Sequence, residues 1–144
     1  QCEATLVTKD ELFARSDILS IHLKLSDRTR GLVGKHELRL MKPTAYLVNT
    51  SRGPIVVESA LVKILQDRAI AGAGLDVFDR EPLPLGHPFL RLDNVILTPH
   101  LGYVTEDTYQ EFYKESVEDI LAYLKGQPVR VVNLAVLKVM NRRF

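Results

Sequence analysis

The sequence has few of the residues and patterns that mark several classes of protein. Its 144 residues include a single cysteine, Cys2, and no tryptophan. One cysteine cannot close a disulfide within the chain, so a disulfide-stapled secreted domain is excluded and a reducing compartment is expected. No apolar run approaches the ~20 residues of a membrane-spanning helix, and the first ten residues lack the basic and then apolar layout of a signal peptide. We therefore expect a soluble, cytoplasmic protein.

An excess of charge of one sign is also missing. Lys and Arg number 19 and Asp and Glu number 18, which gives a net charge of +1. This balance does not favour a nucleic acid or an acidic membrane as partner. The four histidines and Cys2 show no metal-ligand spacing such as H-x-x-x-H, so no metal site is expected.

Apolar segments that resemble strands alternate with segments that resemble helices. Strands are expected at residues 4–8, 17–23, 44–50, 72–78 and 94–100, with one more within 129–140. Helices are expected from Thr8 through Phe13, before Pro43, over 57–70, and from Thr105 to about 125. The strands are nearly continuous apolar runs, which is typical of a parallel sheet covered on both faces. The predicted fold class is α/β with a doubly wound parallel sheet.

The helix that begins at Thr105 has an apolar stripe at helical spacing. The stripe comprises Tyr109, Phe112, Tyr113, Val117, Ile120, Leu121 and Leu124. Side chains in such a stripe pack against a neighbouring element more often than they stack on nucleic-acid bases. We therefore interpret the stripe as a packing surface, and we expect a boundary between 1–104 and 105–144.

Three of the predicted strands are followed by polar side chains that could do chemistry. Arg52 follows one strand, Asp76 and Glu81 follow the next, and His100 follows the last. Parallel strands end at one edge of a sheet, where ligands bind in this fold class. A guanidinium can hold a carboxylate, and an imidazole beside a glutamate can exchange a proton near neutral pH. Each side chain taken alone also has a purely structural interpretation.

The combination of motifs is more specific than any one of them. "LVNTSRGPIV", "AGAGLDVFDREPLP" and "NVILTPHLG", together with "SDILSIHLKLSDRTRGLVGKHEL" upstream, resemble the NAD-dependent D-2-hydroxyacid dehydrogenase family. The resemblance implies a Rossmann-like fold in which 1–104 is the second part of an NAD-binding domain. It also implies that 105–144 is an interdomain helix and tail of a substrate domain. The implied activity is hydride transfer between NAD and a 2-hydroxy or 2-oxo acid.

The resemblance also implies roles for individual residues. Arg52 would orient the substrate carboxylate and carbonyl, His100 would be the general acid and base, and Glu81 would pair with His100. Asp76 would contact the carboxamide side of the nicotinamide. The residues expected to contact the cofactor are Lys24, Thr50, Arg52, Asp76, His100 and Gly102.

The chain departs from the family pattern in two respects. No G-x-G-x-x-G turn stands in the sequence before the first predicted strand, so we expect this chain to carry only part of the family's cofactor site, and Lys24 stands where the family commonly has proline. We expect an incomplete chain whose open sheet edge pairs with another copy, giving a homo-oligomer, or with a missing N-terminal segment. Two alternatives stay open: an NAD-responsive, non-catalytic module like the corepressors related to this family, and a fragment kept for packing alone.

Overall fold

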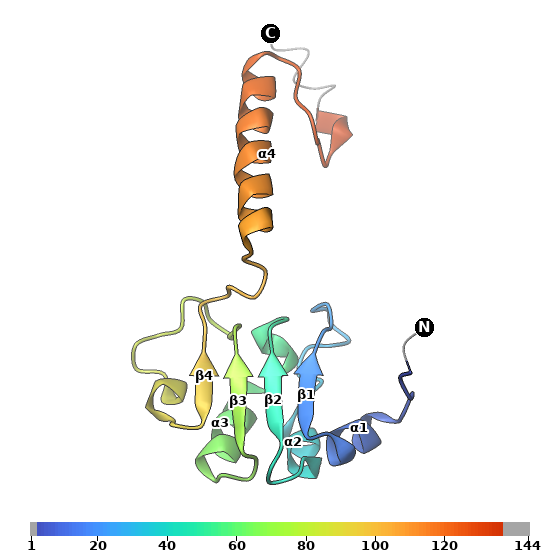
Figure 1. The fold of residues 1–144 in the computed structure, drawn as a ribbon, viewed down its shortest axis with the longest axis vertical. Coiled ribbons are helices and arrows are strands. Elements are labelled where there is room, and N and C mark those ends of the chain that lie inside the picture. The colour runs from blue at the N-terminus through green and yellow to red at the C-terminus, as the bar shows by residue number, and fades with distance from the viewer. Residues whose placement is uncertain (1–2, 137–144) are drawn as a thin grey trace. The chain divides into compact units, whose positions relative to one another are not determined.

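The computed structural model describes residues 3–136, which contain a four-stranded parallel sheet (Figure 1). Its strands are β1 (Ile18–Ile21), β2 (Tyr46–Asn49), β3 (Gly72–Leu75) and β4 (Val95–Leu97), which lie side by side in chain order. Their register is close, with Ile21 beside Asn49 and Asn49 beside Leu75. The strands therefore finish at the same edge, and the predicted α/β fold class is confirmed.

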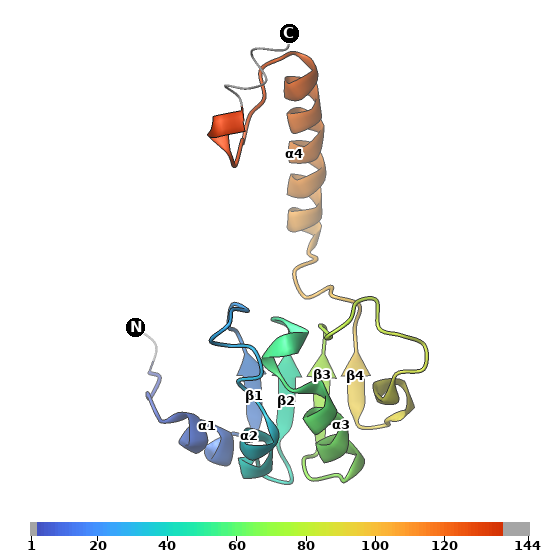
Figure 2. The same ribbon diagram turned by 180° about the vertical axis from the view of Figure 1, so that it is seen from behind.

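The helices of residues 1–102 form a layer on one face of this sheet. α1 (Lys9–Arg15) packs on α2 (Lys35–Leu40), and α2 packs on α3 (Glu58–Gln66). Figure 2, which views the molecule from behind, shows α2 and α3 in front of the strands. Parallel strands joined in order by crossovers of the same hand place every connection on the same face, which accounts for the single layer.

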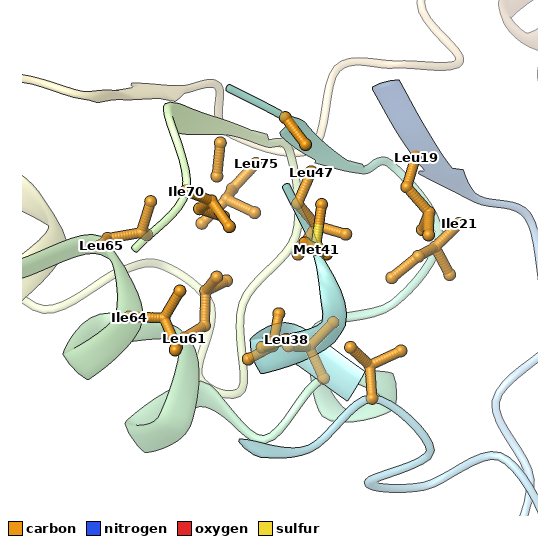
Figure 3. Close-up of a cluster of buried hydrophobic side chains, with 14 of the residues drawn as sticks. Leu19, Ile21, Leu38, Met41, Leu47, Leu61, Ile64, Leu65, Ile70 and Leu75 are labelled. Carbon is orange, nitrogen blue, oxygen red and sulfur yellow. The ribbon is translucent and has the colours of Figure 1, made fainter. Parts of the chain in front are cut away.

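The hydrophobic core lies between this helical layer and the sheet (Figure 3). Alternate strand residues point into it, and the helices contribute residues at helical spacing. Its buried members include Leu19, Ile21, Leu38, Met41, Leu47, Leu61, Ile64, Leu65, Ile70 and Leu75. Leu61, Ile64 and Leu65 of α3 are buried in this core, and Ala60 beside them is partly buried.

The opposite face of the sheet is open among the described residues. Ile18, Tyr46 and Ile96 are exposed by 69%, 51% and 73%, although each belongs to a strand of apolar character. The strands predicted a sheet covered on both faces, and the described helices cover only one of them. The open face is consequently an apolar surface on a well-packed layer.

The segment before α1 does not form the strand expected at 4–8. Residues 3–8 have no regular structure, and Leu6 is 98% exposed. A single strand has no stability without a hydrogen-bonded neighbour, and residues 3–8 do not pair with the free side of the edge strand β1. The helix start predicted at Thr8 is confirmed, because the Thr8 hydroxyl accepts the Glu11 N–H and the Glu11 carboxylate accepts the Thr8 N–H.

Residues 103–144 form a second compact unit, described here to residue 136. Its main element is α4 (Glu106–Leu124), which begins at the predicted N-cap Thr105. Every member of the apolar stripe is at least 50% exposed, so the packing expected for this stripe is not found among the described residues. No helix within 3–136 has both the length and the apolar character needed to cross a membrane.

The tail after α4 folds back onto the acidic side of the helix. Arg130 lies 2.7 Å from Glu118, 2.8 Å from Asp119 and 3.2 Å from Glu115. The strand expected within 129–140 is absent from its described part, where residues 129–136 contain a 3₁₀ turn at Leu134–Val136. Residues 137–140 of that expected strand lie outside the described residues.

The Glu37 carboxylate makes the fold sensitive to acid. It is 10% exposed, lies 2.6 Å from Lys9 Nζ and accepts the Gly34 N–H at 2.8 Å. Burial acts to raise the pKa of Glu37, but the hydrogen bonds from Lys9 and the backbone outweigh it and lower the pKa from 4.5 to about 2. Because the pKa of Glu37 is lower in the folded state, the ionised carboxylate stabilises the fold. This contribution is present above pH 4.5 and is lost as the pH falls towards 2.

We predict that Glu37→Gln lowers the free energy of unfolding by about 2 kcal/mol at neutral pH, because it removes this ionised group. The loss should shrink as the pH falls through the same window. Urea denaturation at a series of pH values measures both effects. Wild type and variant curves that run parallel down to pH 2 would contradict the assignment.

Candidate functional site

The ends of β2, β3 and β4 bring the predicted site residues to one edge of the sheet. Arg52 lies three residues beyond the end of β2, Asp76 directly follows β3, and His100 lies three residues beyond β4. These polar groups share an edge because the strands are parallel and in register. The expected convergence of three separate segments is therefore observed.

Glu81 and His100 form a direct pair. Glu81 Oε2 lies 2.7 Å from His100 Nδ1, and Glu81 Oε1 accepts the Phe78 N–H at 2.9 Å. Burial acts to raise the pKa of Glu81, but the hydrogen bonds from His100 and Phe78 and the charges of His100 and Arg52 outweigh it, so the pKa is lowered. The ionised Glu81 carboxylate orients the imidazole through this contact.

His100 has a backbone conformation that is uncommon for a residue with a side chain. Its φ angle is +59°, in the left-handed region. Such a conformation costs energy and persists only where surrounding contacts enforce it. The contacts that enforce it come from Asp76.

The Asp76 carboxylate holds the segment that carries His100. Asp76 is 4% exposed; its Oδ1 accepts hydrogen bonds from Thr98 Oγ1 at 2.5 Å and from the Leu101 N–H at 2.8 Å. Its Oδ2 accepts the Gly102 N–H at 2.7 Å. Burial acts to raise the pKa of Asp76, but these bonds outweigh it and lower the pKa. The predicted contact of Asp76 with nicotinamide stays a prediction beside this observed role.

A buried amide fixes the turn that presents Arg52. Asn49 is 1% exposed; its Nδ2 donates to the Arg52 carbonyl at 3.0 Å, and its Oδ1 accepts the Ser51 N–H at 3.1 Å. The Ser51 hydroxyl in turn donates to the Leu23 carbonyl at 2.9 Å, which links the ends of β1 and β2. The Arg52 backbone is thus fixed, while its side chain is exposed to solvent.

Gly53 brings the Arg52 turn into contact with the segment after β3. A Cβ atom on Gly53 would lie 2.1 Å from the Phe78 carbonyl carbon and 2.6 Å from the Asp79 nitrogen. Real Cβ atoms do not approach backbone so closely, so only glycine fits at this position. The segments carrying Arg52 and Glu81 are therefore in direct backbone contact.

Two hollows lie at this edge of the sheet. One, of about 510 Å³, is lined by Lys24, Thr50 and Arg52, and the other, of about 470 Å³, is lined by Glu81, His100 and mostly apolar neighbours. A Cβ on Gly102 would lie 3.0 Å from Asp76 Oδ2 and 3.5 Å from Thr50 Cβ. The backbone at Gly102 therefore lies close to both residues. The two hollows fit the expectation that a cofactor binds along this edge.

Several residues that shape the site were not singled out from the sequence. Asn49 and Thr98 are polar groups at strand ends whose partners become clear only in the fold. The His87 side chain is only 14% exposed and its Nε2 lies 3.0 Å from Glu58 Oε1. A polar residue at the end of an apolar strand is the one signal that could have identified Asn49.

Comparisons with known proteins give a consistent result. Residues 1–102 match the family described as D-isomer specific 2-hydroxyacid dehydrogenase, NAD binding domain. A glyoxylate reductase from Thermofilum pendens is 48% identical over 131 residues, which cover 90% of this chain and 39% of that protein. A crystal structure of a provisional D-3-phosphoglycerate dehydrogenase from Ralstonia solanacearum superposes with a TM-score of 0.86 at 42% identity, covering 93% of this chain and 39% of that one.

A third relative was solved with the cofactor bound. It is the NAD-complexed form of a D-isomer specific 2-hydroxyacid dehydrogenase from Lactobacillus delbrueckii ssp. bulgaricus, with a TM-score of 0.71 and 32% identity. The match covers 88% of this chain and 42% of that one. The chain thus spans about two fifths of the length of these relatives.

We predict that Asp76→Asn lowers the free energy of unfolding by about 1–3 kcal/mol. In the variant, an amide NH₂ group would face one of the N–H groups whose hydrogen bond the carboxylate now accepts. Asp17→Asn is the matched control, since Asp17 is 78% exposed and its ion pair with Lys42 contributes little. Urea denaturation at neutral pH compares the two variants. Equal stability of the two would show that Asp76 does not hold the His100 segment.

Proposed function

Because the chain belongs to the D-isomer specific 2-hydroxyacid dehydrogenase family, we propose that it serves hydride transfer between NAD and a small 2-hydroxy or 2-oxo acid. The observation that carries this proposal is the 2.7 Å pair of Glu81 and His100 at the sheet edge, on the segment adjoining the Arg52 turn. NAD is the cofactor of this family, and it supplies the hydride chemistry when bound.

The side chains at the edge of the sheet bind the substrate and transfer the proton. Arg52 binds the substrate carboxylate through its guanidinium, which matches the geometry of two carboxylate oxygens. His100 exchanges a proton with the substrate oxygen through Nε2, since Nδ1 faces Glu81. The ionised Glu81 stabilises the imidazolium that forms when the hydroxy acid is oxidised. Lys24, Thr50, Asp76 and Gly102 would line the cofactor beside them.

The substrate class follows from the relatives. Those with high identity are named glyoxylate reductases and glyoxylate/hydroxypyruvate reductases B. Glyoxylate and hydroxypyruvate are therefore the first 2-oxo acids to test. We place this activity in the cytoplasm, where a lone cysteine stays reduced.

We expect NADH to raise the melting temperature of this chain in a thermal-shift assay, because a ligand that binds only the folded state stabilises it. In the full-length gene product, Arg52→Ala should lower kcat/KM for glyoxylate by about 100-fold, on the scale of a lost charged hydrogen bond. His100→Ala should lower kcat with little change in the Kd for NADH. NADH oxidation followed by absorbance measures both variants.

Arg39→Ala, a change of an exposed arginine on α2, is the control for general effects of lost charge. Activity that survives both site changes would overturn the assigned roles. NADH binding without turnover of any 2-oxo acid would favour a non-catalytic NAD-responsive module instead.

We further propose that the exposed apolar surfaces are covered by a second copy or by a further protein segment. The open sheet face exposes Ile18, Tyr46 and Ile96, and α4 exposes its whole apolar stripe. Apolar surfaces of this kind mark interaction sites. We expect light scattering of the 144-residue chain to report a mass larger than one copy, and the double change Tyr46→Lys with Ile96→Lys to reduce it. A monodisperse monomer before any substitution would contradict the proposal.

A further inference from the structure

Residues 79–87, called here the Glu81 loop, carry Glu81 from the end of β3 towards His100. The loop contains neither helix nor strand, so no backbone ladder fixes its path. Leu85 within it is 97% exposed, whereas Leu83 packs against the edge of the core. Further contacts are made at the two ends of the loop, so the direction of the Glu81 side chain depends on these contacts as well as on Leu83.

One carboxylate contacts both ends of the Glu81 loop. Glu58, the first residue of α3, accepts the Asp79 N–H through Oε2 at 3.2 Å. Its Oε1 lies 3.0 Å from His87 Nε2. The side chains of Glu58 and His87 are 23% and 14% exposed, so solvent screens this pair only partly.

The His87 end of this bridge is itself anchored in the core. His87 Nδ1 accepts the Phe89 N–H at 3.3 Å, which places the ring proton on Nε2, where it is donated to Glu58. The imidazole packs on the ring of Phe89 with centroids 4.8 Å apart, and Phe89 is 2% exposed. Glu58 thus connects the start of α3, the end of the Glu81 loop and a buried aromatic ring.

The same carboxylate lies beside the contact between the Arg52 and Glu81 segments. The Asp79 nitrogen that donates to Glu58 is one of the atoms against which Gly53 packs. A shift of the Asp79 backbone would therefore disturb the contact between the Arg52 turn and the Glu81 loop.

We propose that Glu58 and His87 are positioning residues that hold the Glu81 loop so that Glu81 faces His100. The proposal rests on the proposed function only in treating Glu81 and His100 as the proton-handling pair. A merely structural role would change the free energy of unfolding and leave the environment of Glu81 as it is. A positioning role changes that environment as well, and this difference can be measured without any turnover.

The test follows the pH titration of the Glu81 carboxyl carbon by ¹³C NMR in the 144-residue chain, alongside urea denaturation. The lowered pKa of Glu81 depends on its bonds to His100 and to the Phe78 N–H, which outweigh the effect of burial. We expect Glu58→Gln to raise the Glu81 midpoint, because an amide oxygen and an amide nitrogen cannot accept the two hydrogen bonds that the two Glu58 oxygens accept.

Glu37→Gln is the matched control. Glu37 is also a largely buried carboxylate near the start of a helix that accepts one backbone N–H and pairs with one basic side chain. It lies away from the Glu81 loop and contacts α1 instead. We expect Glu37→Gln to lower stability and leave the Glu81 midpoint at its wild-type value.

A second pair of variants decides the outcome if Glu58→Gln does not fold. His87→Gln keeps an N–H that can donate to Glu58, and His87→Leu does not. We expect the Glu81 midpoint to stay near the wild-type value in His87→Gln and to rise in His87→Leu. Midpoints that are unchanged in Glu58→Gln and His87→Leu, with stability lost as in Glu37→Gln, would overturn the proposal.

Failure of the proposed function would look different. The Glu81 midpoints of the 144-residue variants would shift as expected, while the wild-type full-length gene product would not oxidise NADH with a 2-oxo acid.

Discussion

The buried Asp76 carboxylate is the interaction on which the geometry of the candidate site depends. It stands at the end of an interior strand and accepts hydrogen bonds from three groups of the segment that follows β4. A carboxylate in this position is stable only while those donors surround it, because an ionised group in a poorly solvated place is otherwise costly. The same bonds hold His100 in a left-handed conformation that a free loop would leave. A structural anchor and a chemical group that follow different strands are thus brought together in space.

Around this anchor, each segment at the sheet edge is fixed by a polar side chain. Asn49 braces the Arg52 turn, Glu58 joins the two ends of the Glu81 loop, and Glu81 meets His100. Loops without regular hydrogen bonding have many accessible conformations, so side-chain bonds of this kind select one of them. The core keeps the anchors in place because it buries one face of β1, β2 and β3 and partly covers β4. The packing of the core and the orientation of the site are therefore connected.

Much of the fold could be predicted because it follows from local patterns. Apolar runs identified β1 to β4, and the Thr8 and Thr105 caps identified two helix starts. The meeting of Arg52, Glu81 and His100 at one edge followed from the parallel arrangement. The strand at 4–8 was wrong, because pairing depends on a neighbour that periodicity does not reveal. Partners distant in the chain, such as Glu58 and His87, were missed for the same reason, and apolar character alone did not show which sheet face the helices would cover.

The close approach of Gly53 to the backbone of Phe78 and Asp79 has a consequence for motion. Two backbones in van der Waals contact resist sliding past one another, so the Arg52 turn and the start of the Glu81 loop move together. A hinge movement that closed a neighbouring domain over a bound acid would carry both backbone segments with it. The spacing between these two backbone segments would then be the same in open and closed forms.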